Sequence, residues 1–289
     1  MLTYQVIVNG LLLGGLYACI AVGFSLIWGV LNLINLAHGS MMIMGAYVTW
    51  LISTSTGVDP FLTLPIAATV VFFFAYAVQR VLINRIIDGS AFMTLILTFG
   101  LNLVLINLHI ALFTADLRSV PVPYSGAGLE INGVRIPYVR LAVFALALAL
   151  TIGLHVFLTR SRIGQAIRAV AQHRRAAAVV GVDIKEIYAM TFAIGGFVAG
   201  AAGSLMAIVF SFSPVIGDAF TLKSFVVVIL GGLGSVPGAL LGGIVLGMIE
   251  SIAVVVLAGG WRDAVTFSLL VLILVLRPQG LLGRPVHGH

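Results

Sequence analysis

Polar and flexible residues interrupt an otherwise apolar stretch near the start of the chain. Residues 29–53 are uncharged apart from one imidazole, and their polar run consists of Asn32, Asn35, His38, Gly39 and Ser40. We predict a helix break near residues 35–39 and a new helix from about Ser40. Because the first turn of a helix has free N–H groups, this restart is suited to holding an anion such as a carboxylate. The alternative is a short turn between two spans, since Asn, Gly and Ser are ordinary turn formers.

A second flexible run lies near the other end of the chain. Residues 231–239 read GGLGSVPGA and contain Gly231, Gly232, Gly234 and Ser235. The two runs lie at similar distances from the two ends. In transporters built from inverted repeats, interrupted apolar segments in corresponding positions mark the solute site. We therefore expect the two breaks to border a path for a solute.

Isolated polar residues within apolar segments are further candidates. Thr94, Thr98 and Asn102 are spaced by four, so they share one face of a helix. This pattern favours hydrogen bonding between helices over direct contact with a solute, but the three residues remain candidates for the path.

Two charged residues and one histidine also fall in or beside apolar segments. For Glu250, structural hydrogen bonding is favoured over solute binding. Lys223 is expected to extend toward Asp218, and His109 is expected at the membrane interface.

Several kinds of chemistry are disfavoured by what the sequence does not contain. No G-x-x-x-x-G-K-[ST] run is present, so the chain is not expected to bind or hydrolyse ATP. No nucleophile–base pair or metal-ligand cluster stands out, and the single Cys19 excludes an intrachain disulfide. We therefore expect neither catalytic residues, nor a bound metal, nor a cofactor. The net charge of +6 comes from localised basic residues, which argues against nucleic-acid binding.

The elements that carry these residues are predicted from composition. The chain has 289 residues, of which 61% are hydrophobic and 8% charged, and the mean hydropathy is +1.19. These values predict an all-α polytopic membrane protein with about eight to nine transmembrane segments, some of them broken into half-helices. Arg80, Arg85 and the basic residues at 160–185 lie on one side, which the positive-inside rule makes cytoplasmic. The longest loop on the other side contains Asn132-Gly133 between apolar residues and predicts a small hairpin.

One long polar segment, residues 159–188, stands apart from the apolar remainder. It holds six of the 15 Lys and Arg residues. A stripe at helical spacing predicts a short amphipathic helix, with Ser161 as N-cap and Gly181 as its stop; the stripe consists of Ile163, Ile167, Val170 and Ala171. The segment is interpreted either as a basic loop that only fixes topology or as a helix that docks on a partner protein.

The docking interpretation rests on a resemblance. Residues Gly164, 168–171, Ala177 and 181–182 resemble the coupling loop of ABC-importer permeases, and more narrowly the branched-chain amino acid (LivH-type) permease family. The runs NLAHGS at 35–40, LGGLGSVPGA at 230–239 and RPQGLLG at 277–283 extend this resemblance over nearly the whole chain.

The resemblance implies that residues 1–289 form a single ABC-importer permease domain with its coupling loop at 160–188. The residues that it places at the ATPase interface are Ile163, Gly164, Arg168, Ala169, Ala177 and Gly181. It also implies a second, LivM-type permease, two ATPase subunits that bind ATP–Mg, and a periplasmic solute-binding protein, assembled in lipid in the bacterial inner membrane with the coupling loop and C-terminus cytoplasmic.

The solutes associated with the family are leucine, isoleucine and valine, and also urea, short amides and aromatic acids. Other classes fit the sequence less well. A secondary transporter should show paired ionisable groups, a channel needs no docking helix, and a membrane scaffold would not explain the two breaks.

Overall fold

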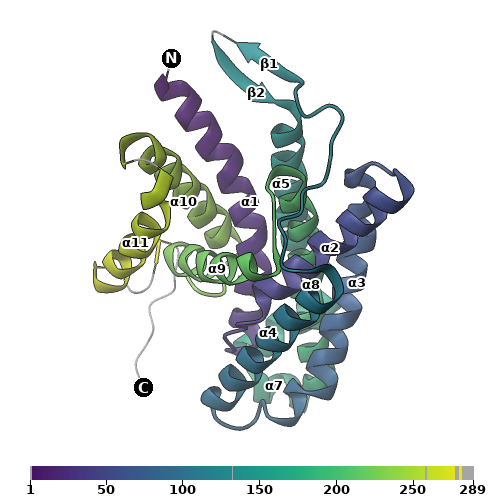
Figure 1. The fold of residues 1–289 in the computed structure, drawn as a ribbon. Coiled ribbons are helices and arrows are strands. Elements are labelled where there is room, and N and C mark those ends of the chain that lie inside the picture. Colours follow the sequence, from purple (N-terminus) through teal and green to yellow (C-terminus); the bar gives the residue numbers. More distant parts are fainter. Residues whose placement is uncertain (1, 132, 258, 277–279, 282–289) are drawn as a thin grey trace.

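The computed structural model describes the whole chain except residues 1, 132, 258, 277–279 and 282–289. Its described residues form eleven α-helices and one two-stranded sheet (Figure 1). The elements in order are α1 Leu2–Leu31, α2 His38–Thr56, α3 Pro60–Val81, α4 Ala91–Phe113, β1 Gly128–Ile131, β2 Val134–Pro137, α5 Tyr138–Arg160, α6 Arg162–Gln172, α7 Arg174–Val179, α8 Ile184–Val209, α9 Gly217–Gly231, α10 Val236–Leu257 and α11 Arg262–Leu276, with short 3-10 turns at Ile83–Arg85, Pro214–Ile216 and Gly259–Trp261.

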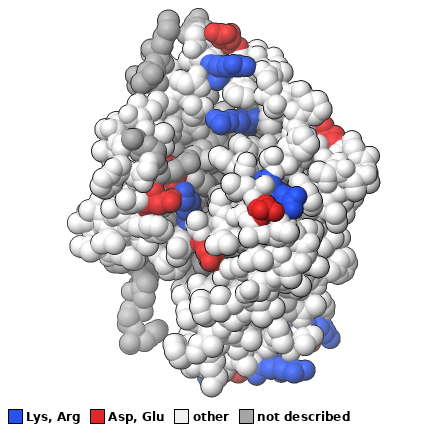
Figure 2. Space-filling model, viewed as in Figure 1, with Lys and Arg blue, Asp and Glu red and all other residues white. Residues whose placement is uncertain are grey.

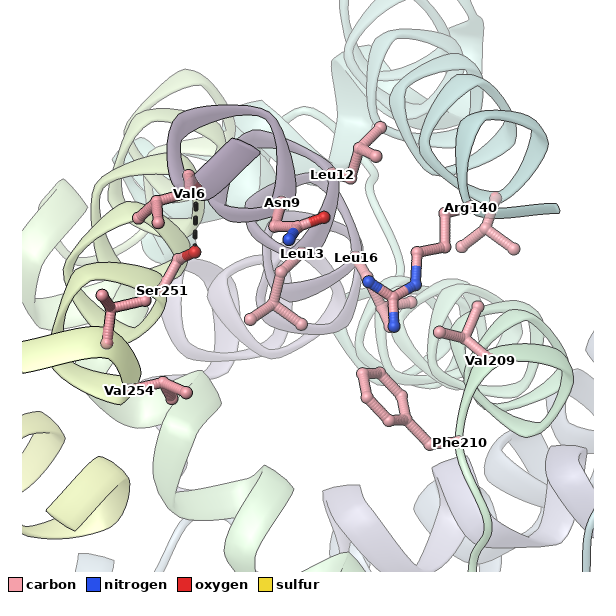
Figure 3. Close-up of a pocket in the computed structure, with 12 residues that line it drawn as sticks. Val6, Asn9, Leu12, Leu13, Leu16, Arg140, Val209, Phe210, Ser251 and Val254 are labelled. Atoms are coloured by element: carbon pink, nitrogen blue, oxygen red, sulfur yellow. Dashed lines mark hydrogen bonds between the residues drawn. The ribbon is translucent and has the colours of Figure 1, made fainter. Parts of the chain in front are cut away.

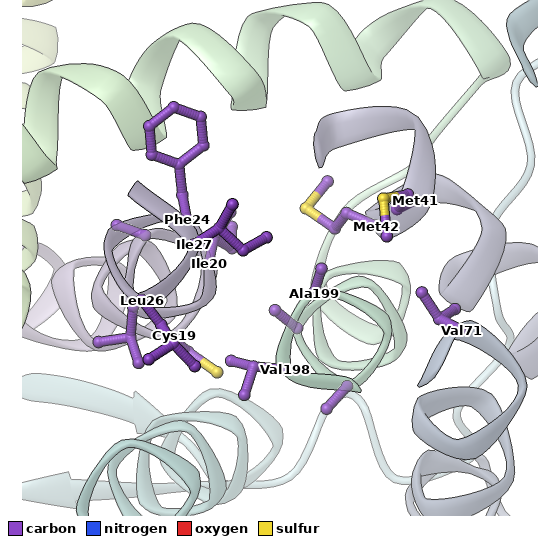
Figure 4. Packing of buried hydrophobic residues seen from close by; sticks show 14 of the residues in the cluster. Cys19, Ile20, Phe24, Leu26, Ile27, Met41, Met42, Val71, Val198 and Ala199 are labelled. Carbon is purple, nitrogen blue, oxygen red and sulfur yellow. The ribbon is translucent and has the colours of Figure 1, made fainter. Parts of the chain in front are cut away.

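The core is built around α8, whose side chains are buried on nearly all sides. Figure 4 shows Val198 and Ala199 of this helix between α1, which supplies Cys19 and Ile27, and α2, which supplies Met42. Small residues make this arrangement possible, because without a bulky side chain two helices can approach until their backbones touch.

Helices α1 and α10 make one such contact. Each carries a G-x-x-x-G pair, Gly10 with Gly14 and Gly243 with Gly247. A Cβ atom on Gly14 would lie 2.6 Å from the Cα of Ile244, and one on Gly247 would lie 2.4 Å from the backbone nitrogen of Gly14. No side chain fits at such distances, so the glycines set the separation of these two helices.

Seven helical stretches among the described residues are long and apolar enough to cross a membrane. The sequence-based number of eight to nine is higher because it includes α2 and α11. Helix α11 has only 15 residues, fewer than the ~20 that a span needs. Helix α2 is almost enclosed by protein, with Met41, Ile43 and Ala46 fully buried. It therefore needs no apolar surface for lipid, and its composition is more polar than that of a lipid-facing span.

Helices α3, α4 and α5 lie at the periphery and expose large apolar side chains. Phe73 is 65% exposed, Val104 62% and Ile152 50%. Apolar exposure on this scale suits a hydrocarbon surrounding. The hairpin β1–β2 pairs Ile131 with Val134, which confirms the predicted hairpin, although Asn132 lies outside the described residues. The hairpin and α7 lie at opposite ends of the molecule (Figure 1).

Candidate functional site

The first helix break lies inside the protein. Asn32 has a φ of 51°, which ends α1, and residues 32–35 are not helical. The Asn35 side chain accepts a hydrogen bond from the amide of Ala37 at 3.1 Å, and this turn starts α2. Asn35 and His38 are fully buried, so the break is not an exposed turn. The predicted break is confirmed, and α2 begins two residues before the predicted start.

The first amides of α2 already have partners. His38 N–H donates to the carbonyl of Asn35 at 3.2 Å, and Gly39 N–H donates to Oγ1 of Thr221 on α9 at 2.8 Å. These amides join α2 to its neighbours in this conformation, so the geometry supplies no free donor at His38 or Gly39 for an anion.

A chain of hydrogen bonds leads from α2 to the surface. Ser40 Oγ donates to Oδ1 of Asn102 at 2.6 Å, and the Asn102 amide donates to the exposed carboxylate of Asp218 at 2.8 Å. Thr98 donates to the carbonyl of Ile34 within the break at 3.1 Å, whereas Thr94 bonds within α4. Thr98 and Asn102 thus join helices, as their shared helix face predicts.

The second break lies beside the first. Gly232 and Gly234 have positive φ angles of 106° and 76°, and α10 starts after Ser235, whose Oγ accepts from the amide of Gly238 at 3.1 Å. A Cβ atom on Gly29, at the end of α1, would lie 2.7 Å from the Cα of Gly234. Gly231 is buried at the end of α9. The fold therefore brings together two breaks that are some 200 residues apart in the sequence.

An acid–base cluster joins α9, α10 and α11. The ammonium of Lys223 lies 2.9 Å from the Glu250 carboxylate and 3.2 Å from that of Asp263. Glu250 also accepts hydrogen bonds from Tyr17 and Thr266, both at 2.6 Å. The expected contact of Lys223 with Asp218 is wrong, because Lys223 pairs with Glu250 and Asp263, whereas Asp218 accepts a hydrogen bond from Asn102. Sequence reasoning missed this ion pair, since Glu250 and Lys223 lie on different helices.

The polar segment forms two helices rather than the single one that the stripe predicts. Ser161 caps α6 as predicted, with its Oγ 2.9 Å from the amide of Gly164. Helix α6 ends at Gln172, His173 is extended with φ −148° and ψ 91°, and α7 follows. This bend allows Ala177 to be buried against the bundle. Gly181 ends the segment with a φ of 89°.

The two helices have distinct inner and outer faces. The buried face consists of Gly164, Ile167, Val170 and Ala177, whereas Ile163 and Ala171 of the predicted stripe are exposed. A Cβ atom on Gly164 would lie 2.4 Å from the carbonyl oxygen of Phe157, so this glycine lets α6 lie directly against the end of α5. Gly164 and Ala177 are thus packing residues.

The outer face combines cations with an apolar tip. Arg168, Ala169 and Gly181 are exposed, and Val179 and Val180 are 87% and 78% exposed. In Figure 2, Lys and Arg residues are visible at the end where α7 lies and also near the opposite end, while most of the visible face carries no charge. Exposed neighbouring valines beside arginines are typical of a surface that a protein partner covers.

Two ion pairs fix the segment relative to α3 and α4. Arg174 bonds the carboxylate of Asp88 in the loop before α4, and Arg80 of α3 bonds Glu186 at the start of α8. The hydrogen bond and positive charge of Arg174 lower the pKa of Asp88 below its ordinary value. Both pairs are exposed to solvent, so they orient the segment more than they stabilise it.

Comparisons with known proteins identify the family to which the chain belongs. Residues 6–275 match the family model described as "Branched-chain amino acid transport system / permease component". The chain is 33% identical to the high-affinity branched-chain amino acid transport system permease protein BraD of Pseudomonas aeruginosa, over 97% of this chain and 96% of that protein. It is 31% identical to the permease protein LivH of the corresponding system of Escherichia coli K12, with the same coverage.

A solved structure, PsaBC from Streptococcus pneumoniae in complex with Fab, matches 94% of this chain and 91% of that chain with a TM-score of 0.48 and 12% identity. The match to the family model covers nearly the whole chain, and two relatives above 30% identity cover almost all of it. The chain therefore belongs to the branched-chain amino acid transport permease family, the membrane-embedded components of ABC transport systems.

Proposed function

We propose that this chain forms one side of the translocation path of an ABC importer for branched-chain amino acids. The observation that carries the proposal is the segment 160–188, in which two helices are packed on the bundle by an inner face and present an outer face of arginines and exposed valines. A transporter that works without partner subunits needs no docking surface of this kind.

The alternative solutes are urea, short amides and aromatic acids, which an importer with the same subunit arrangement would carry.

The segment is suited to transmitting motion from an ATPase subunit. Gly164 holds α6 on the end of α5, and Asp183 caps α8 by accepting hydrogen bonds from the amides of Lys185 and Glu186 at 3.0 and 3.2 Å. The segment is therefore tied at both ends to long helices. When two ATPase subunits close on ATP–Mg, a shift of α6 and α7 would tilt α5 and α8 together.

The path itself is proposed along the face where the two breaks meet. Asp218 is exposed there and is joined through Asn102 to Ser40, so its carboxylate is placed to attract the ammonium group of an amino acid. Rocking of α9 would break the Gly39–Thr221 hydrogen bond and release the amides of α2. The remaining proposed path residues are Asn32, Asn35, His38, Thr94, Thr98, Gly231, Gly232, Gly234 and Ser235.

The assembly that we propose has five parts. A second, LivM-type permease completes the path, two ATPase subunits dock on segments such as 160–188, and a periplasmic binding protein delivers the solute at the end where the hairpin lies. The segment 160–188 and the C-terminus would then face the cytoplasm of a bacterium, with residues 1–289 as a single permease domain. Arg277 and Arg284, which support this orientation, lie outside the described residues.

The test is purification of the chain from its native membrane, with identification of its partners, followed by uptake into proteoliposomes. We expect two ATPase subunits and a second permease to be recovered, and leucine uptake to require ATP. Recovery of the chain alone, with uptake driven by an ion gradient, would overturn the proposal. The Lys223–Glu250 pair would then be the first candidate for ion coupling.

A further inference from the structure

A cavity of about 260 Å³ lies at the hairpin end of the molecule, between α1, α5 and the ends of α8 and α10. Its walls are mostly apolar and include Leu12, Leu16, Val143 and Val209. This volume is slightly below the range of pockets for drug-sized ligands, and it suits a molecule the size of a single amino acid.

One cation overhangs the cavity without a partner. In Figure 3 the guanidinium group of Arg140 extends from α5 toward Leu16 and Phe210. Two other arginines at this end bond to carbonyls, Arg118 to that of Phe113 and Arg135 to that of Gly126. Within the part of the chain that the structure describes, Arg140 makes no hydrogen bond and no ion pair.

The backbone around Arg140 adds to the excess of positive charge. Arg140 lies in the first turn of α5, which contains no acidic residue. The amino end of a helix carries partial positive charge, so an anion is favoured there and a cation slightly disfavoured. A bound carboxylate would be attracted by both the guanidinium group and the helix end, and guanidinium binds carboxylates through two parallel hydrogen bonds.

The cavity also offers an acceptor for an ammonium group. Asn9 lines it, and its Oδ1 accepts one hydrogen bond from Gln5 at 3.2 Å. A carboxamide oxygen has two lone pairs, so a second donor can be accommodated. The site therefore combines a cation, an amide oxygen and a short apolar cavity. These three features complement the carboxylate, the ammonium group and the side chain of an aliphatic α-amino acid.

We propose that this cavity is a solute subsite, in which Arg140 binds the carboxylate and the leucine and valine side chains enclose the aliphatic group. This proposal rests on the proposed function and specifies where the solute enters the path. Arg140 and the start of the docking segment at Arg160 are about 30 Å apart along α5, the length of 20 helical residues. The subsite thus lies at the end opposite to the ATPase surface, where a solute arrives from outside.

The experiment measures binding of isotopically labelled leucine to the assembled transporter in nanodiscs, with leucine and leucinol as competitors. Leucinol has the same side chain and ammonium group but no carboxylate. In the unaltered complex we expect leucine to compete roughly 10- to 100-fold better than leucinol, as the loss of a charged hydrogen-bonding partner predicts. In Arg140→Gln this preference for leucine over leucinol should disappear. The control is Arg135→Gln, which lies three residues before the start of α5 and should retain the preference.

A second variant tests the apolar part of the site. Val209→Phe fills the cavity and should weaken leucine and leucinol binding alike. Both variants are compared by thermal unfolding, so that loss of fold is recognised separately.

Two results would overturn the subsite while leaving the proposed function intact. In the first, ATP-dependent leucine uptake is normal and Arg140→Gln keeps the preference for leucine. In the second, the preference is kept but Arg140→Gln loses bound anionic phospholipid, which would assign the cavity to a lipid headgroup. A complex that takes up no leucine at all would overturn the proposed function, and the subsite with it.

Discussion

The ammonium of Lys223 on α9 lies 2.9 Å from the carboxylate of Glu250 on α10, and the Glu250 side chain is fully buried. Removing one partner leaves the other charge in an apolar environment. We therefore expect Lys223→Met to destabilise the protein by about 3–5 kcal/mol. The double variant Lys223→Met with Glu250→Leu should recover much of this loss, because it leaves no uncompensated buried charge, since the remaining carboxylate of Asp263 is exposed. Thermal unfolding of the purified protein measures both, and an unchanged melting temperature in Lys223→Met would contradict the ion pair.

The glycine contact between α1 and α10 gives a second prediction. Gly14→Leu should prevent the two helices from packing, since a Cβ atom at Gly14 already lies within 2.6 Å of the Ile244 backbone. The expected result is loss of folded protein, measured by size-exclusion chromatography in detergent. Gly100→Leu on α4 is the matched control, because a Cβ atom there meets nothing within 4 Å. Equal yields of the two variants would show that α1 and α10 do not pack in this way.

The exposed valines of the docking segment predict a defect in assembly. Val179→Asp combined with Val180→Asp should abolish recovery of ATPase subunits with the permease, because charged groups are disfavoured at the centre of an interface. The chain should remain folded, since both residues are exposed. Leu117→Asp introduces a charge at a residue that is 72% exposed outside the segment and should leave recovery unchanged.

Arg168→Glu and Gly181→Trp address coupling rather than assembly. Both positions are exposed, so the chain should still reach the membrane. We expect ATP hydrolysis to continue while leucine uptake falls, as measured in parallel on the same proteoliposomes. Normal uptake in both variants would remove 160–188 from the proposed coupling pathway.

The Arg174–Asp88 contact predicts an effect of pH on the docking segment. The pKa of Asp88 is lowered by Arg174, so the contact stabilises the fold above the unfolded-state pKa of about 4 and is lost as the pH falls through the lower folded-state pKa. Carbon-13 NMR of labelled aspartate should show the pKa of Asp88 rising in Arg174→Gln. The pKa of Asp88 should remain unchanged in Arg175→Gln, because in the described structure Asp88 is paired with Arg174 and not with Arg175.

The sequence predicted those features that depend on local pattern. Thr94, Thr98 and Asn102 lie on one helix, α4, as their spacing predicts, and the turn chemistry of Asn35 and Gly232 located both helix breaks. Ser161 was identifiable as a cap because its side chain bonds within its own turn. In each of these cases the residues that decide the structure are neighbours in the chain.

Features that depend on distant partners could not be predicted in this way. Periodicity shows that Lys223 is near an apolar face, but not that Glu250 rather than Asp218 will be its partner. His109 was expected at the membrane interface, yet it is buried with its ring 5.3 Å from that of Tyr47. No Pro or Gly in the sequence marks the bend at His173. The bend depends instead on the packing of Ala177 against the bundle, which the local sequence does not reveal.

The ion pair between α9 and α10 also bears on how the chain enters the bilayer during synthesis. A lysine at the centre of an isolated helix opposes insertion by about 2.5–3.5 kcal/mol. Helix α9 is joined to α10 by only the four residues 232–235. An unpaired Lys223 therefore disfavours insertion of α9 alone, and Glu250 must be synthesised before Lys223 is neutralised. The two helices should leave the translocon together as a hairpin, so that a single buried contact sets the order in which this half of the protein is assembled.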